Sequence, residues 1–533
     1  MISRNNLRIG IDLGTTNSCC FYELDGKAIP LHTEQGGYIL PSCVDYKGDD
    51  KILVGQLAKD RLAKGSKTSH VVSNSKRIIG KDFDDPSVQQ LIDYCGVPIM
   101  NQGGKPVFKI NEHKVVTPKE VATEIIKTIL SQVRKVCERD PTHVCVTIPA
   151  RFGHNERVLT RQAVIDAGIP KSAVVIQNEP TVAAICYGED FANEGSHRVL
   201  VYDLGGGTFD LSIVEINNGH YKVVCHEGDP NLGGADFDRL IMEWVETKYY
   251  KEYHESLFPS SMPAKISTKY RNMYLQEIEE YKASLSSEKS VDMTFDFIKN
   301  YNPVSLDDDD DDDEEENEFI FPLTTCVMNT ILKDKIDKTL EMINSLLTKR
   351  NLTKSDIDAV ILVGGSTRLH IVQEELSKMF GSSKLKFSVN PDECVAKGAC
   401  LSLIHKENIT EVTSKSLGMG VTGNRVYCII PTQTPLPAKQ TIRAATSADY
   451  LSRSSSCVIQ CYQEKVEELM PIDNSCVILH PFRYYGFESK PKGQVTFLTT
   501  FTIDRCGMLS VRVVEEKTNK VLIDDMQVEV HEL

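Results

Sequence analysis

Short apolar runs and longer amphipathic runs alternate along the first four hundred residues of the chain. The runs at 144–148 and 359–363 are almost wholly apolar, and the run at 8–13 is apolar except for Arg8 and Asp12, as is typical of strands that are buried on both faces. Two further apolar runs, at 199–202 and 209–214, flank a group of glycines. These segments predict sheets that are covered by helices.

The helical segments carry clear start and stop signals. Thr117, Pro118 and Glu120 form a capping box with proline at the first helical position, and apolar residues then recur at helical spacing through 121–136. A second helix is predicted at 156–167, because Gly168 follows it directly. The alternation of such helices with strands predicts the α/β class.

Strict alternation of apolar and polar residues replaces the helical pattern after about residue 405. Two alternating segments, 494–504 and 509–513, are separated by a turn at 504–507, which predicts a hairpin with one buried face. Its inward residues are Val495, Phe497, Phe501, Ile503, Leu509, Val511 and Val513. The segment 416–533 therefore reads as a small all-β domain.

Composition and charge narrow the class of protein. The 533 residues are enough for three or four domains or subdomains. The net charge is −15, but ten of the 75 acidic residues form one run at 307–316, and the other acidic residues nearly balance the 60 basic ones. That run predicts a solvated acidic loop. We expect no nucleic-acid partner and no membrane partner.

The cysteines and the N-terminal segment bear on the compartment. Sixteen cysteines are scattered without a C-x-x-C pair, which disfavours zinc ribbons and thioredoxin-like sites. The first strand-like run begins at Leu7, which leaves no room ahead of it for a signal peptide, and no apolar run reaches membrane-spanning length. We therefore expect a protein of the reducing cytoplasm.

Two glycine-rich stretches follow strand-like runs that contain an aspartate. Gly14, Thr15 and Thr16 come after Asp12, and the stretch 205–208 (GGGT) comes after Asp203. Backbone amides in such turns can cradle phosphate oxygens, and an aspartate ahead of the turn can hold a divalent cation through its water shell. The alternative is a pair of ordinary glycine-rich hairpin turns. Because the aspartate and the glycine turn occupy matching positions in the two stretches, we favour two related lobes that face one phosphate chain.

Six stretches together resemble the heat-shock protein 70 family of chaperones. They are 11–18 (IDLGTTNS), 177–184 (QNEPTVAA), 202–210 (YDLGGGTFD), 231–238 (NLGGADFD), 363–368 (VGGSTR) and 390–399 (NPDECVAKGA). The resemblance implies an actin-like, two-lobed ATPase domain over 1–405, a linker over 406–412, and a β-sandwich over 413–533 that holds extended apolar peptides. It also implies slow ATP hydrolysis, with ATP or ADP, Mg²⁺ and K⁺ as ligands.

The resemblance assigns roles to matched residues. Lys76 would contact the γ-phosphate and the attacking water, Asp203 would orient that water, and Glu179 would link the metal site to the lobe interface, with Thr208 as the fourth catalytic residue. Asp12 and Asp203 would serve Mg²⁺, and Asp210 would serve K⁺. The implied nucleotide contacts are Gly14, Thr15, Thr16, Asn17, Gly205, Gly206, Gly207, Thr208, Glu279, Lys282, Ser286, Gly364, Gly365, Ser366, Arg368 and Asp392.

The chain departs from the family pattern in three places. Ala283 stands where the family has an arginine that stacks on adenine, so we expect weaker adenosine binding. The linker reads KENITE and has Ile409 as its one apolar residue, so we expect weak coupling between the domains. The sequence ends after the β domain, so we expect no helical lid and fast peptide exchange.

These observations predict an ATP-dependent chaperone that binds unfolded polypeptides. A J-domain co-chaperone and a nucleotide-exchange factor are the partners that the resemblance implies. Two alternatives remain: a poorly hydrolysing regulatory subunit of a larger chaperone or ribosome-associated complex, and a small-molecule kinase. Met419, Val421 and Ile459 fall near the family's peptide pocket, although they could equally be core residues of a sandwich.

Overall fold

The computed structural model describes most of the chain. The described residues are 6–34, 36–46, 52–63, 70–92, 95–188, 195–296, 318–405, 408–421, 423–451, 453–461, 469–473 and 476–528. The predicted acidic loop at 307–316 and the first two linker residues lie outside these ranges.

The first lobe is built on a mixed sheet with the order β12-β11-β1-β2-β3, in which β4 also pairs with β2. Strands β1, β11 and β12 run parallel, and β2 and β3 continue antiparallel. The bounds are β1 Arg8–Asp12, β2 Asn17–Leu24, β3 Lys27–Pro30, β4 Ile39–Pro41, β11 His143–Ile148 and β12 Val174–Asn178. The apolar run of β1 is buried on both faces, as a central strand requires.

The second lobe repeats this topology. Its sheet has the order β19-β18-β13-β14-β15-β20, with β13, β18 and β19 parallel and β14 and β15 antiparallel. The bounds are β13 Ser196–Leu204, β14 Phe209–Asn217, β15 His220–Asp229, β18 Ala359–Val363, β19 Leu385–Lys386 and β20 Asn408–Thr410. Three antiparallel strands followed by two parallel ones therefore occur twice, which confirms the duplicated α/β fold.

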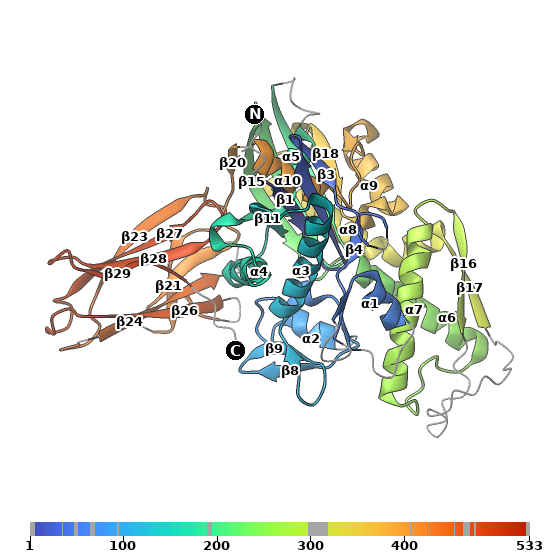
Figure 1. The fold of residues 1–533 in the computed structure, drawn as a ribbon, viewed down its shortest axis with the longest axis horizontal. Coiled ribbons are helices and arrows are strands. Elements are labelled where there is room, and N and C mark those ends of the chain that lie inside the picture. Colours follow the sequence, from blue (N-terminus) through green and yellow to red (C-terminus); the bar gives the residue numbers. More distant parts are fainter. Residues whose placement is uncertain are drawn as a thin grey trace.

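Helices fill three layers around the two sheets (Figure 1). The outer face of the first sheet packs on α3 (Pro118–Cys137) and α4 (His154–Asp166). Helices α5 (Glu179–Cys186) and α10 (Cys394–His405) lie between the sheets. The outer face of the second sheet packs on α6 (Gly234–Tyr253), α7 (Ala264–Ser284), α8 (Thr325–Lys349) and α9 (His370–Phe380).

Smaller elements complete both lobes. The first lobe adds β5 Val44–Asp45, β6 Leu53–Val54, α1 Gln56–Ala63, β7 Val71–Val72, the 3-10 turn η1 Ser75–Ile78, α2 Pro86–Ile92, β8 Ile99–Gln102, β9 Lys105–Lys109 and β10 Val115–Val116, and η2 Lys171–Ala173 leads into β12. The second lobe adds the hairpin of β16 Ser290–Asp296 and β17 Glu318–Thr324, and the 3-10 turns η4 Lys354–Asp356, η5 Gly365–Arg368 and η6 Ser382–Lys384.

The β domain is a sandwich of two sheets that lies at the left of Figure 1, against α4. One sheet has the order β25-β22-β21-β24-β26 and the other has the order β23-β27-β28-β29. The bounds are β21 Ser416–Val421, β22 Arg425–Ile430, β23 Ala438–Ala445, β24 Arg453–Cys461, β25 Leu469–Pro471, β26 Cys476–Tyr485, β27 Thr496–Ile503, β28 Leu509–Glu515 and β29 Val521–Gln527.

Several local expectations are confirmed. Thr117 caps α3 through a complete capping box with Glu120. The predicted hairpin is the β27–β28 pair, and its inward apolar residues are buried. The second predicted helix, expected over 156–167, is α4 and runs His154–Asp166. Helix α7 ends at Ser284, so that Ser286 lies in the turn after it.

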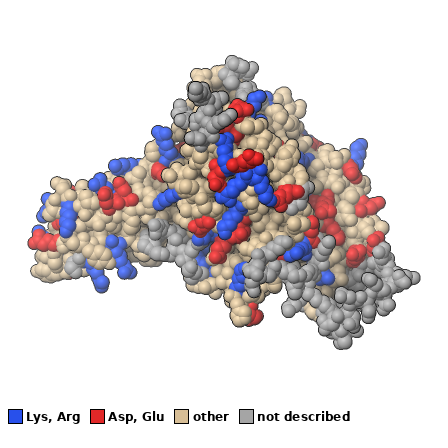
Figure 2. All heavy atoms as spheres, viewed as in Figure 1, with Lys and Arg blue, Asp and Glu red and all other residues tan. Residues whose placement is uncertain are grey.

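The surface and the helices are also informative about charge and hydropathy. On the face drawn in Figure 2, basic and acidic side chains are interspersed rather than gathered by sign. Within the described ranges, every helix is either too short or too polar to cross a membrane.

Candidate functional site: the cleft between the lobes

A cavity of about 480 Å³ lies in the cleft between the two lobes. This volume is in the usual range for small-molecule sites. All the residues that the sequence assigned to nucleotide or catalysis line it, together with the metal candidates Asp12 and Asp203. Asp210 does not line the cavity. It lies behind Asp203, as its cross-strand partner on β14.

The two glycine turns face each other across this cavity. A Cβ atom built on Gly206 would lie 2.1 Å from Thr16 Oγ1, and one built on Gly207 would lie 2.8 Å from Thr15 Cγ2. Gly233, at the start of α6, is equally close to the backbone of Gly207. Side chains at Gly206 and Gly207 would collide with Thr16 and Thr15 of the opposite lobe, and one at Gly233 would collide with the second glycine turn of its own lobe, so the glycines are needed for these close approaches. Ordinary hairpin turns would not require this.

Lys76 reaches into the cleft from η1 and forms a buried ion pair with Glu179. Their Nζ and Oε1 atoms are 2.7 Å apart, and Glu179 is the first residue of α5. Burial opposes the charge of Lys76, but Glu179 and Asp12 outweigh this effect and raise its pKa. The lysine is therefore held as a cation beside the glycine turns.

Three aspartates stand around this lysine at the ends of strands. Burial, and then the charge of Glu179, raise the pKa of Asp12 to about 7, and the same two causes raise the pKa of Asp203 well above its usual value. Asp210 is buried, and its pKa is also raised to about 7 by burial and then by Glu179. Its Oδ1 atom has no hydrogen-bond partner.

This surplus of buried carboxylates fits a cation. Within the described ranges, no three His, Cys, Asp or Glu side chains are close enough together to ligate a metal ion directly. The residues therefore suit a divalent ion that is held through its water shell and by phosphate oxygens. The unpartnered Oδ1 of Asp210 is the strongest sign of a missing positive partner.

The opposite end of the cavity is lined by α6, α7 and η5. Lys282 Nζ lies 2.6 Å from Asp238 Oδ1 and donates to the carbonyl of Gly234 at 3.0 Å. Ser366 donates to the carbonyl of Gly205 at 3.2 Å, and Arg368 pairs with Asp392 at 2.8 Å. These contacts join η5 to the second glycine turn and α7 to the start of α6.

Two further predicted nucleotide contacts, Glu279 and Ser286, lie on or just after α7, near Ala283, where the family pattern has an arginine. Glu279 pairs with Lys59 of α1 at 2.8 Å, across the mouth of the cleft. Ser286 and Ala283 both line the cavity. The small Ala283 leaves this wall without the cationic side chain that the family places there, as the sequence indicated.

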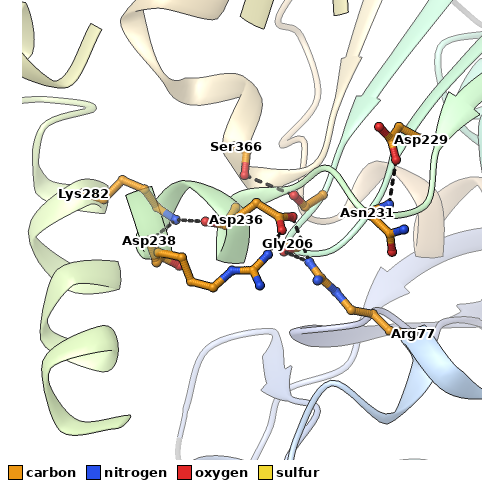
Figure 3. A network of polar contacts seen from close by, with 11 residues as sticks. Arg77, Gly206, Asp229, Asn231, Asp236, Asp238, Lys282 and Ser366 are labelled. Atoms are coloured by element: carbon orange, nitrogen blue, oxygen red, sulfur yellow. Dashed lines mark hydrogen bonds and ion pairs between the residues drawn. The ribbon is translucent and has the colours of Figure 1, made fainter. Parts of the chain in front are cut away.

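Residues that sequence reasoning missed tie the lobes together. Figure 3 shows Arg77, from the first lobe, directed at Asp236 and Gly206 of the second. Its Nη2 atom lies 3.1 Å from Asp236 Oδ2, and Arg239 also pairs with Asp236. The stretch NLGGADFD carried the family resemblance, but no local pattern linked its aspartates to arginine or lysine partners. Asp236, Asp238 and Arg239 were missed for this reason, and Lys59 was missed because its partner Glu279 lies 220 positions later in the chain.

The linker docks on both lobes, although its sequence led us to expect weak coupling between the domains. Strand β20 extends the second sheet by pairing in parallel with β15. Glu411, just beyond it, is buried and accepts hydrogen bonds from Asn178 Nδ2 at 2.7 Å and Thr181 Oγ1 at 2.5 Å. A polar clamp thus holds this linker, in which Ile409 is the one apolar residue.

The β domain also contacts the first lobe directly. The backbone N–H of His154 donates to Gln460 Oε1 at 3.1 Å, and His154 Nε2 lies 2.6 Å from the carbonyl oxygen of Val528. Ser414 donates to the carbonyl of Phe152 at 2.9 Å. Of the candidate peptide contacts, Met419 and Val421 pack in the sandwich core, whereas Ile459 belongs to a separate apolar cluster on the outer face.

Two lobes of one topology, a cleft lined by paired glycine turns and an attached sandwich define the class of actin-like ATPase folds with a β domain. A family model described as "Hsp70 protein" matches residues 8–531. The chain is 30% identical over 532 residues to "Heat shock 70 kDa protein" of Neurospora crassa. That alignment covers 97% of this chain and 77% of the Neurospora protein. It is 30% identical over 526 residues to "Heat shock 70 kDa protein BIP3" of Oryza sativa subsp. japonica, with coverage of 96% and 74%.

The chain belongs to the heat shock protein 70 family. Family membership supports a chaperone role, and members of this family generally bind ATP or ADP with Mg²⁺ and act on client polypeptides with co-chaperones.

Proposed function

We propose that this protein is a cytoplasmic, ATP-dependent chaperone that hydrolyses ATP slowly and binds extended polypeptides through its β domain. The carrying observation is the buried Lys76–Glu179 pair, which lies with Asp12 and Asp203 where the two glycine turns meet. A J-domain co-chaperone and a nucleotide-exchange factor are the proposed partners, on family membership.

The residues of the cleft have different roles in the proposed hydrolysis of ATP. Bound Mg·ATP supplies the phosphoanhydride bond to be broken and a divalent charge. The turn amides of Gly14–Asn17 and Gly205–Thr208 hold phosphate oxygens, and Lys76 adds a fixed positive charge where negative charge grows during the reaction. Asp203 would orient the attacking water, and the buried Asp210 would offer its unpartnered Oδ1 to K⁺.

Single-turnover hydrolysis of ATP by the purified chain tests this proposal. We expect measurable hydrolysis that falls by about 10²–10³-fold in Lys76→Ala, because a preorganised charge is lost from the site. Lys105→Ala is the matched control, since Lys105 pairs with Asp82 on the surface, away from the cleft. Nucleotide binding without hydrolysis in the unaltered protein would contradict the proposal that this chain is an ATPase.

That contrary result would favour the regulatory alternative. That alternative is a subunit that binds nucleotide for stability, and the weaker base contact expected from Ala283 is compatible with it. Equilibrium binding of ATP and ADP, measured beside the turnover experiment, separates the two outcomes.

A further inference from the structure

The outer face of the β24 sheet carries a group of thiols beside a small apolar cluster. Cys457, Ile459 and Cys461 occupy alternate positions of β24, and their side chains share the face that packs with Val426 and Met470. The intervening Val458 points into the sandwich core. The alternation thus separates the thiols from the main core and places them on the side away from the second sheet.

Cys461 faces Cys476 directly across two paired strands. The two residues are register partners in the antiparallel β24–β26 pair, and their Sγ atoms lie 3.6 Å apart. Directly opposed residues in antiparallel strands have Cα atoms about 4.5–5.5 Å apart, which lies within the range that disulfides span. Formation of the bond requires the sulfurs to approach by about 1.5 Å, a movement that side-chain rotation can supply.

We propose that Cys461 and Cys476 are a redox modification site, which hydrogen peroxide converts reversibly into a disulfide. All sixteen cysteines are free thiols in the structure, so this pair is present in its reduced form. A metal is a poorer explanation for the thiols, because no third ligand joins the pair within the described ranges.

The difference in exposure between the two thiols sets the order of the reaction. Cys476 is partly exposed, whereas Cys461 is buried, and burial raises its pKa to about 12. Peroxide therefore reacts first with the Cys476 thiolate, which attacks one peroxide oxygen, breaks the O–O bond and releases hydroxide, protonated to water. Cys476 sulfur is now a sulfenic acid. The Cys461 sulfur then attacks it, and the thiol proton leaves with the sulfenic oxygen as a second water.

The chain topology gives this bond a mechanical effect. In the sequence β25 lies between β24 and β26, but it pairs with β22 at the opposite edge of the sheet, whereas β26 lies beside β24. A bond between Cys461 and Cys476 would link the end of β24 to the start of β26, and so close the segment that contains β25 into a loop. The disulfide would therefore restrain β25 and Met470, which packs in the same outer cluster. Any influence on polypeptides that contact Ile459 rests on the proposed function.

Disulfide mapping on the full chain tests the site without any substitution. The protein is treated with hydrogen peroxide, remaining thiols are alkylated, and a non-reduced digest is analysed by mass spectrometry. We expect a cross-linked pair of peptides containing Cys461 and Cys476 that lacks two hydrogens, with loss of both thiols and full recovery after reduction by dithiothreitol. Amide hydrogen exchange of residues 469–471 should be slower in the oxidised protein.

Single substitutions supply the controls. Cys476→Ser and Cys476→Ala should abolish the cross-link, and Cys428→Ser should keep it, because Cys428 is similarly half-buried but is not opposite either residue. Accumulation of sulfinic acid on Cys476 while Cys461 remains a free thiol would overturn the proposal. Unchanged exchange at 469–471 in the cross-linked protein would overturn the restraint of β25. Neither readout depends on ATP hydrolysis or peptide binding.

Discussion

A lysine that is buried at the junction between the domains lowers the stability of the folded state at neutral pH. Lys415, just after the linker, is buried, and burial followed by the nearby Arg151 lowers its pKa to about 7, although Glu156 acts in the opposite direction. In the unfolded chain a lysine has a pKa of about 10.4. As the pH falls from about 10 to 7, the unfolded state therefore gains a proton that the folded state does not, and this group lowers stability over that window.

Replacement of this residue by an apolar one should remove the penalty. We expect Lys415→Met to raise the free energy of unfolding at pH 7 by about 1–4 kcal/mol and to flatten its rise between pH 7 and pH 10. Urea unfolding at several pH values measures both effects. Lys439→Met is the control, because Lys439 is exposed on β23 and should change neither quantity. An unchanged slope for Lys415→Met would mean that the lysine is charged in the fold.

At the scale of elements, the linker shows which features a sequence reveals. The capping box at Thr117 and the alternation in β27 were predicted because their signals are local. The clamp on Glu411 was not, because its partners Asn178 and Thr181 lie more than two hundred positions earlier, and a glutamate in a polar linker reads as solvated. The Arg77–Asp236 pair escaped prediction for the same reason.

Loss of the clamp should release the linker. We expect Glu411→Ala to weaken docking by about 1–3 kcal/mol, because Asn178 and Thr181 lose the acceptor of their buried hydrogen bonds. Small-angle X-ray scattering should then show a larger radius of gyration as the domains separate. Glu516→Ala, at an exposed ion pair within the β domain, is the control. A radius that stays the same in Glu411→Ala would show that the β-domain contacts alone hold the domains together.

At the scale of the molecule, one ligand site is shared by both lobes. The first lobe supplies Thr15, Thr16 and Lys76, and the second supplies Gly205–Gly207 and Lys282, so that either lobe alone has half a cavity. The duplicated topology could be inferred from the matching Asp-Leu-Gly steps. The distance between the turns could not, because it depends on how α5 and α10 pack between the sheets.

Nucleotide should therefore stabilise the two lobes together. Mg·ATP at a hundred times its dissociation constant should add about 2.7 kcal/mol to the free energy of unfolding. The one tryptophan, Trp244, packs against the second-lobe core and reports that lobe, while far-ultraviolet circular dichroism reports the whole chain. Both thermal transitions should rise, and Gly206→Ala, whose Cβ would meet Thr16, should lose the effect. A rise in the fluorescence transition alone would mean that the lobes unfold independently.

The close contact between β1 and α10 has a consequence for folding while the chain is being synthesised. A Cβ atom on Gly10 would lie 2.2 Å from the backbone nitrogen of Cys400, so β1 and α10 are in direct backbone contact. Ribosomes add about 5–20 residues per second, so β1 waits about 20–80 s for the helix that covers it. Throughout this interval the nascent first lobe exposes the apolar side of its sheet. A protein that we propose as a chaperone is therefore, during its own synthesis, a candidate for protection by others.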